Sequence, residues 1–226
     1  MLQEVASLNK RAIEYLGAER HDEAVAGFTK AMHLVHQYCV RDFEIDVLRA
    51  IENTTRVGHM AISEVRTSPC TTLNVVPSDA NDVLFEVYTR PFLIDASVVV
   101  PPSVLFVALS FNVGLVYHRL GLQRSSLDYL KNAIHYYEYG LSIIKQNSLE
   151  GYCSNGMYWL TLALLTNVGN ILWSLWCTSE ALACQKRVHL LIGTKQIFTL
   201  PPEDVEFFLD ISSSGIFCSR NVAPAA

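Results

Sequence analysis

Charged residues are scarce in this chain. Asp, Glu, Lys and Arg make up 17% of its 226 residues, and hydrophobic residues make up 50%. A charged share of about 25% is typical, so this composition excludes a disordered tail or a solvated coiled coil and predicts a packed globule. The 17 basic residues against 22 acidic residues give a formal net charge of −5. That charge argues against a general nucleic-acid binder.

The chain also lacks the sequence features of secretion and of metal binding. Its amino terminus, MLQEVASLNKRAIEYLGAERHDEA, has no basic patch followed by an apolar run and a cleavage site, so we expect no signal peptide. The six cysteines show no Cys-x-x-Cys spacing, which favours an intracellular, cytoplasmic protein with reduced thiols. His33, His36 and Cys39 lie three apart but drift around a helix, so we interpret them as packing side chains and expect no metal.

No catalytic motif is present in the sequence. It contains no Gly-rich phosphate loop, no nucleophile elbow and no paired-carboxylate signature. The triplet Tyr117-His118-Arg119 has catalytic residue types, but its spacing fits a helix whose tyrosine is packed. We therefore expect no enzymatic activity and no cofactor.

Apolar residues recur at helical spacing over most of the chain. The period predicts two helices before residue 50, joined near Glu19 and Arg20, with the second continuing or restarting through Ile51. It predicts five more over residues 104–117, 127–145, 157–175, 179–192 and 203–211. Between these groups, β-branched and aromatic runs at 71–76 and 83–88 predict two strands or extended arms, and Pro101-Pro102 closes this insertion.

These elements predict a single domain over residues 1–226. Its parts are a first helix pair and extension (1–60), an extended insertion (65–103), and a second and third helix pair with a C-terminal helix (104–226). The fold class is mostly α.

Small and aromatic residues recur in three copies along the predicted helices. The small residue of the first helix and the alanine of the second are 12, 19 and 12 residues apart, so the middle copy carries a 7-residue insertion, placed within 122–130. A small residue lets the second helix approach closely, and the aromatic residue fills the space one turn away. The residues of this pattern are Ala12, Tyr15, Ala24, Phe28 and Ala31; Gly114, Tyr117, Gly121, Ala133, Tyr137 and Gly140; and Gly169, Leu172 and Ala181.

Three segments carry a resemblance to the tetratricopeptide repeat. They are NKRAIEYLGAERHDEAVAGFTKA, FNVGLVYHRLGL with NAIHYYEYG, and TNVGNILWSLWCTSEALACQKRV. The chain also resembles a lineage-expanded group of tetratricopeptide-like proteins of diatoms, through FNVGLVYHRLGL, LFEVYTRPFLIDAS, LLTNVGN and the Ala-Pro-Ala-Ala end. Three residues depart from the repeat pattern: Glu19 replaces the turn glycine, Arg11 a core leucine and Gln185 an aromatic residue.

The resemblance implies an α-solenoid of antiparallel helix pairs with a β-hairpin-like insertion. It also implies a non-enzymatic scaffold that binds a protein or peptide in a groove lined by the first helix of each pair. The basic residues of a carboxylate clamp are missing, so we expect an aromatic and amide-lined groove. Its predicted residues are Lys10, Phe111, Asn112, Leu115, His118, Arg119, Asn167, Asn170 and Trp173.

A membrane-associated helical protein is the alternative interpretation. Residues 157–176 are mostly apolar, carry no charge and have the length of a membrane span. Polar side chains such as Thr166, Asn167 and Asn170 within this stretch argue against contact with lipid. The partner, the pathway and the oligomeric state are not indicated by the sequence.

Overall fold

The computed structural model describes residues 1–42, 62–64, 87–97, 100–146 and 155–213, and these are mostly helical. The predicted helices are confirmed, and their observed ends lie within a few residues of the expected ones, except that the helix predicted over 104–117 continues to Gln123. A possible extension of the second helix to Ile51 lies outside the described residues. The helices are α1 (Leu2–Gly17), α2 (His21–Asp42), α3 (Pro102–Gln123), α4 (Leu127–Gln146), α5 (Asn155–Ser174), α6 (Thr178–Ile192) and α7 (Pro202–Ser213), with a short 3₁₀ helix, η2, at Lys195–Thr199.

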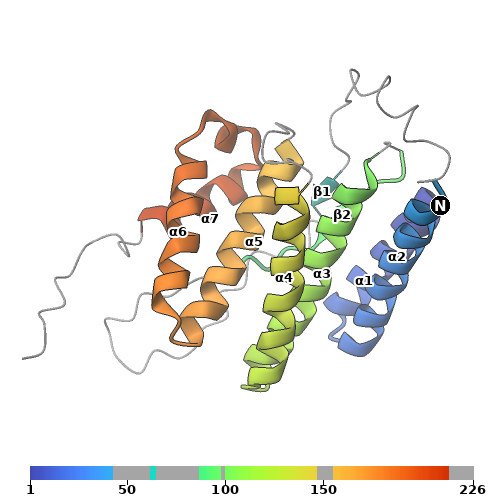
Figure 1. Cartoon of the computed structure of the whole chain (residues 1–226), viewed down its shortest axis with the longest axis horizontal. Helices are drawn as coiled ribbons and strands as arrows, with labels where there is room; N and C mark the ends of the chain where they lie inside the picture. The colour runs from blue at the N-terminus through green and yellow to red at the C-terminus, as the bar shows by residue number, and fades with distance from the viewer. Residues whose placement is uncertain (43–61, 65–86, 98–99, 147–154, 214–226) are drawn as a thin grey trace, which may run out of the picture.

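The helices stand side by side in chain order, from α1 and α2 at one end to α6 and α7 at the other (Figure 1). Each helix packs against the one before it and the one after it. Helices α3 and α5 lie in the middle and are buried almost throughout, which explains their continuous apolar sequences. One hydrophobic cluster runs from Val5 in α1 to Ile211 in α7.

Two short strands pair, and the second of them precedes the start of α3 in the chain. Strand β1 (Ile62–Glu64) runs antiparallel to β2 (Phe92–Ile94), with Ile62 opposite Ile94. The strand predicted at 71–76 and most of that at 83–88 lie outside the described residues, so the hairpin-like insertion stays a prediction. Pro101 and Pro102 stand at the N-cap and first turn of α3, as the proline pair predicted.

The three helix pairs turn in the same way. The turns are three residues long, at 18–20, 124–126 and 175–177, and the middle residue of each has a positive φ: 58° at Glu19, 47° at Ser125 and 61° at Trp176. In each turn the third residue donates its N–H to a carbonyl five residues earlier, as in the Schellman motif. Glu19 therefore occupies the left-handed position that glycine favours, and the same geometry recurs without glycine in all three copies.

The insertion in the middle copy lengthens both helices of its pair. Helix α1 ends five residues after Ala12 and α3 nine after Gly114, while α2 begins three residues before Ala24 and α4 six before Ala133. Four residues are thus added to the first helix and three to the second, about one turn each. The turn keeps its length of three residues because all seven inserted residues lie in the two helices.

Small residues lie where the helices cross closely. A Cβ atom on Gly114 would stand 2.5 Å from the Tyr137 ring, and one on Gly121 would stand 2.5 Å from the Leu130 side chain. Gly169 and the other small residues of the pattern are buried, as are Phe28 and Tyr137, whereas Tyr15, Tyr117 and Leu172 are partly buried. The crossing predicted at Gly114 is confirmed.

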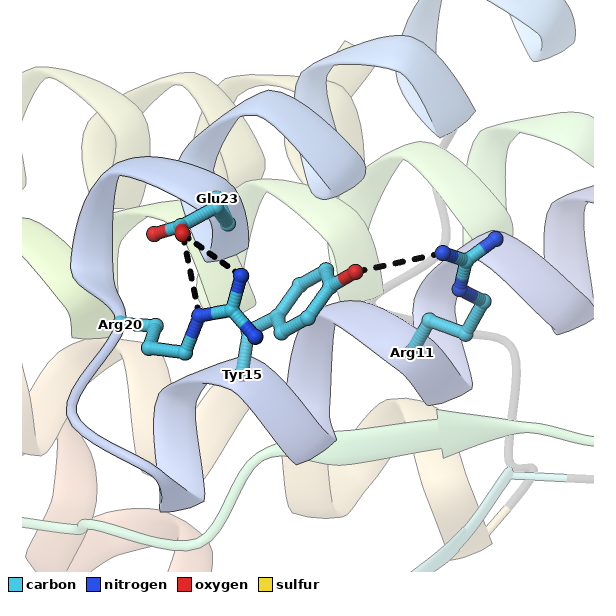
Figure 2. A network of polar contacts seen from close by, with 4 residues as sticks. All are labelled: Arg11, Tyr15, Arg20 and Glu23. Carbon is cyan, nitrogen blue, oxygen red and sulfur yellow. Dashed lines mark hydrogen bonds and ion pairs between the residues drawn. The ribbon is translucent and has the colours of Figure 1, made fainter.

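The first turn carries a surface network (Figure 2). The Arg20 guanidinium lies 4.5 Å from the centre of the Tyr15 ring and donates to Glu23 Oε1 from Nε at 3.0 Å and from Nη2 at 2.8 Å. Arg11 donates to the Tyr15 hydroxyl at 3.2 Å. Arg11, the second departure from the repeat pattern, is exposed, so it leaves no charge in the core.

Replacing Gly114 by alanine is expected to destabilise the protein. The added methyl group meets Tyr137, which is buried and hydrogen-bonded and so cannot move aside, and overpacking of this kind costs about 1–3 kcal/mol. Gly17→Ala is the matched control, because nothing lies within 4 Å of its added Cβ and alanine favours the helix. Urea denaturation measures both; a Gly114→Ala protein as stable as the Gly17→Ala protein would contradict the close crossing.

Candidate functional site

An extended segment of the chain, Val87–Ile94, lies along the first helices of the three pairs. We call the surface it occupies, formed by α1, α3 and α5, the groove. Strand β2 contacts α1 and α3, and the segment's earlier residues reach α5 (Figure 1). Apart from the partly buried Arg90 and Leu93, every residue of the segment is buried. Among the described residues, only Phe92–Ile94 of the segment pair with a strand, so the main-chain groups of its earlier residues need other partners.

Asparagine side chains from two helices hold the main chain of Phe92. Its N–H donates to Asn112 Oδ1 at 2.8 Å, and its carbonyl accepts from Asn112 Nδ2 at 2.8 Å and from Asn9 Nδ2 at 3.0 Å. Asn112 Nδ2 also donates to Asn9 Oδ1 at 2.9 Å. Both asparagines are fully buried.

A third asparagine holds Tyr88 in the same way. The Tyr88 N–H donates to Asn167 Oδ1 at 2.8 Å, and its carbonyl accepts from Asn167 Nδ2 at 3.0 Å. The Asn167 amide also donates to the Tyr137 hydroxyl at 3.1 Å. Asn112 and Asn167 therefore recognise main-chain groups four residues apart, independently of side-chain identity.

Aromatic side chains receive the two residues whose main chains are held. The Tyr88 ring contacts Phe111 on α3 and Phe207 and Phe208 on α7, with centroids 5.4–6.0 Å apart. The Phe92 ring stands edge-on to Phe111 at 5.0 Å and to Trp159 at 5.3 Å. Tyr88 and Phe92 are each 1% exposed.

Charged groups hold the middle of the segment. Arg119 Nη2 donates to the Thr89 carbonyl at 2.9 Å. Arg90 forms an ion pair with Asp204 at 3.2 Å, with the side chains 14% and 1% exposed. Asp204 lies on α7, so the segment is enclosed between α7 and the first helices of the three pairs, α1, α3 and α5.

A buried polar chain continues from the groove into the core. Tyr137 accepts from Asn167, its hydroxyl lies 3.4 Å from His118 Nδ1, and His118 Nε2 lies 3.0 Å from Asn170 Oδ1. Burial lowers the pKa of His118 from 6.5 to about 4, against the opposing effect of the Asn170 hydrogen bond. Burial also raises the pKa of Tyr137. Both side chains are therefore neutral at pH 7.

The structure brings most of the predicted groove residues together. Phe111, Asn112, Arg119 and Asn167 contact the segment; Leu115, His118 and Asn170 are buried; Trp173 is partly buried. Lys10 is exposed, and its neighbour Asn9 takes the buried position that the spacing assigned to Lys10. The insertion was predicted to be extended, but its place in the groove and the ion pair of Asp204 with it were not predicted.

Two further expectations concern metals and membranes. The part of the chain that the structure describes holds no group of three or more potential metal ligands, and His33 and His36 are exposed. Among the described helices, α3 is long and apolar enough to span a membrane, and 83% of its most apolar stretch is buried in the fold. The apolar stretch of the alternative interpretation falls mainly on α5, which is buried throughout 156–171.

A shallow apolar pocket of about 420 Å³, separate from the groove, lies beside α7, and we call it the α7 hollow. Phe198, one of its lining residues, is 76% exposed. Its lining residues are Phe198, Leu200, Pro202, Val205, Glu206, Leu209 and Asp210.

Comparison of the chain with known protein families, curated proteins and solved structures finds no match.

Replacing Asn112 by leucine is expected to lower the free energy of unfolding by about 2–6 kcal/mol. The leucine fills a similar volume but leaves the Phe92 N–H and Asn9 Oδ1 buried without their bonds, at about 1–3 kcal/mol each. Asn132→Leu, on the exposed face of α4, is the matched control and should change stability by less than about 0.5 kcal/mol. Equal denaturation midpoints for the two variants would show that the asparagine does not hold the segment.

Stability is expected to fall as the pH drops from 6.5 to 4. In this window His118 takes up a proton in the unfolded chain but not in the folded one, which removes about 3 kcal/mol by pH 4 and nothing above pH 6.5. Burial lowers the pKa of His21 as well, so His118→Gln isolates the contribution of His118. Thermal melting across this range should show a shallower pH dependence for His118→Gln than for the wild type. Parallel curves would contradict the assignment.

Proposed function

We propose that this protein is a non-enzymatic, intracellular scaffold of the tetratricopeptide type, which binds proteins or peptides. The observation that carries the proposal is the extended segment held in the groove. A surface that binds main-chain N–H and carbonyl groups through side-chain amides has the chemistry needed to bind an extended polypeptide.

The repeated geometry of the helix pairs supports the solenoid part of the proposal. Three pairs share one turn type, and each helix contacts its neighbours in the chain. Stacked pairs of this kind bury a continuous core and leave one concave face to the first helices. In this interpretation the insertion at 65–103 supplies the segment that lies on that face.

The groove contains titratable groups, but their setting supports binding more than catalysis. His118 is fully buried and neutral, and its two ring nitrogens face Tyr137 and Asn170. A general acid or base must reach a substrate atom and titrate near the working pH. His118 meets neither condition, so we assign it a positioning role beside Asn167.

Peptide selection tests the scaffold function. A library of random peptides should yield enriched families with dissociation constants in the micromolar range, on the wild type where they bind the α7 hollow and on Phe92→Ala where they bind the groove. Phe198→Ser removes the exposed ring beside the α7 hollow, so enriched peptides that no longer bind Phe198→Ser are bound there, whereas peptides that bind Phe92→Ala but not the wild type are bound in the groove. Truncating an anchor typically costs about 2 kcal/mol, or roughly 30-fold in affinity.

The matched control is Asn132→Leu, whose side chain lies outside both surfaces and which should bind like the wild type. Because the chain's own segment fills the groove, the selection should be repeated on Phe92→Ala, which weakens that segment. A library that enriches nothing above empty beads on either protein would contradict a peptide-binding scaffold.

A further inference from the structure

We propose that the groove is a binding site for an extended peptide of the form aromatic-x-basic-x-aromatic, and that Tyr88–Phe92 is the copy of this motif that the chain carries itself. The inference rests on the proposed scaffold function and specifies its ligand. It predicts that a separate peptide with this motif and the chain's own segment compete for one site.

The groove binds the main chain at both ends of the motif. Asn167 binds both main-chain groups of Tyr88, and Asn112 binds both main-chain groups of Phe92. Four residues of extended chain span about 13 Å, so the two amides fix an extended conformation between them. A helical peptide is excluded because its main-chain groups bond to one another.

The side-chain pockets define the first and fifth positions. The first pocket is formed by Phe111, Phe207 and Phe208, and the fifth by Phe111 and Trp159. These rings stack on or stand edge-on to the occupant, an arrangement that favours aromatic over aliphatic residues. Phe111 contacts both occupants and therefore sets the distance between the two pockets.

The third position is defined by charge. Asp204 is 1% exposed and pairs with Arg90 of the segment. Because the carboxylate is buried, a neutral or acidic residue in place of Arg90 would remove this ion pair at a high cost in free energy. Arg119 adds a bond to the carbonyl of the second position, which any residue supplies.

The polar lining distinguishes the groove from an ordinary helical core. Three buried asparagines, an arginine and an aspartate converge on the segment, and their hydrogen bonds need a polypeptide main chain and a cation. A site built around such groups rejects occupants that leave them unpaired. The tethered segment has an effective concentration on the order of millimolar, so it excludes a free peptide at micromolar concentration.

Weakening the chain's own segment should therefore open the site to a free peptide. Phe92→Ala should weaken the binding of the chain's own segment in the groove about 10²–10³-fold. The synthetic peptide of residues 87–96, Val-Tyr-Thr-Arg-Pro-Phe-Leu-Ile-Asp-Ala, should then bind in its place. At ten times its dissociation constant, the peptide should raise the melting temperature of full-length Phe92→Ala by about 3–5 °C. Wild type should show no shift.

Two controls make the result specific. Phe28→Ala removes the same ring from a fully buried position on α2, and the peptide should not restore its melting temperature. A peptide with serine in place of Phe92, and one with glutamate in place of Arg90, should have no effect on Phe92→Ala. If Phe92→Ala does not fold, Arg90→Ala, which loses the ion pair with Asp204, serves in its place.

A peptide that shifts neither variant, or shifts Phe28→Ala as strongly as Phe92→Ala, would overturn the inference and make the segment a fixed part of the core. Failure of this test together with enriched peptides that depend on Phe198 would leave the scaffold function in place at the α7 hollow. Failure of both experiments would remove the function as well.

Discussion

The hydrogen bonds between asparagine side chains and the main chain of Val87–Ile94 are the constraint on which the rest of the structure depends. Among the described residues, only Phe92–Ile94 of this buried segment pair with a strand, so its earlier main-chain groups need other partners, and each unmatched main-chain group costs about 1–3 kcal/mol. A side-chain amide carries a donor and an acceptor together, so one asparagine satisfies both groups of one residue. This requirement fixes where Asn112 and Asn167 stand on α3 and α5, and it brings the Tyr88 and Phe92 rings into the core.

The sequence predicted the helices well because their apolar period is local. The repeat register assigned Asn112 and Asn167 to one face, and both bond to the segment; that this face binds a partner stays a prediction. Lys10 was assigned by the same count and is exposed, while Asn9 one position earlier is buried. A one-residue step rotates a side chain by 100° around a helix, so a small shift in register exchanges an inward residue for an outward one. The occupant of the groove left no local signal, because its partners lie 20, 79 and 83 residues away along the chain.

The departures from the repeat pattern have different physical consequences. Glu19 adopts the left-handed conformation that glycine adopts without strain, and Ser125 and Trp176 do the same in the other turns. Arg11 lies on the surface and contacts Tyr15. Gln185 is 4% exposed on α6, where Tyr137 in the preceding copy reaches the groove asparagine through its hydroxyl. The polar chain from the groove therefore passes through the middle copy, since it depends on a tyrosine that the last copy lacks.

The segment in the groove changes how the helix pairs are coupled. In an array whose pairs touch only their neighbours, stability is a sum of local terms, and the end pairs can fray while the centre stays folded. Here one segment bonds to α1, α3, α5 and α7 at the same time, through Asn9, Asn112, Asn167 and Asp204. Opening either end removes partners from a segment that the other end also holds. We therefore expect the helix pairs to unfold in a single cooperative transition rather than from the ends inward.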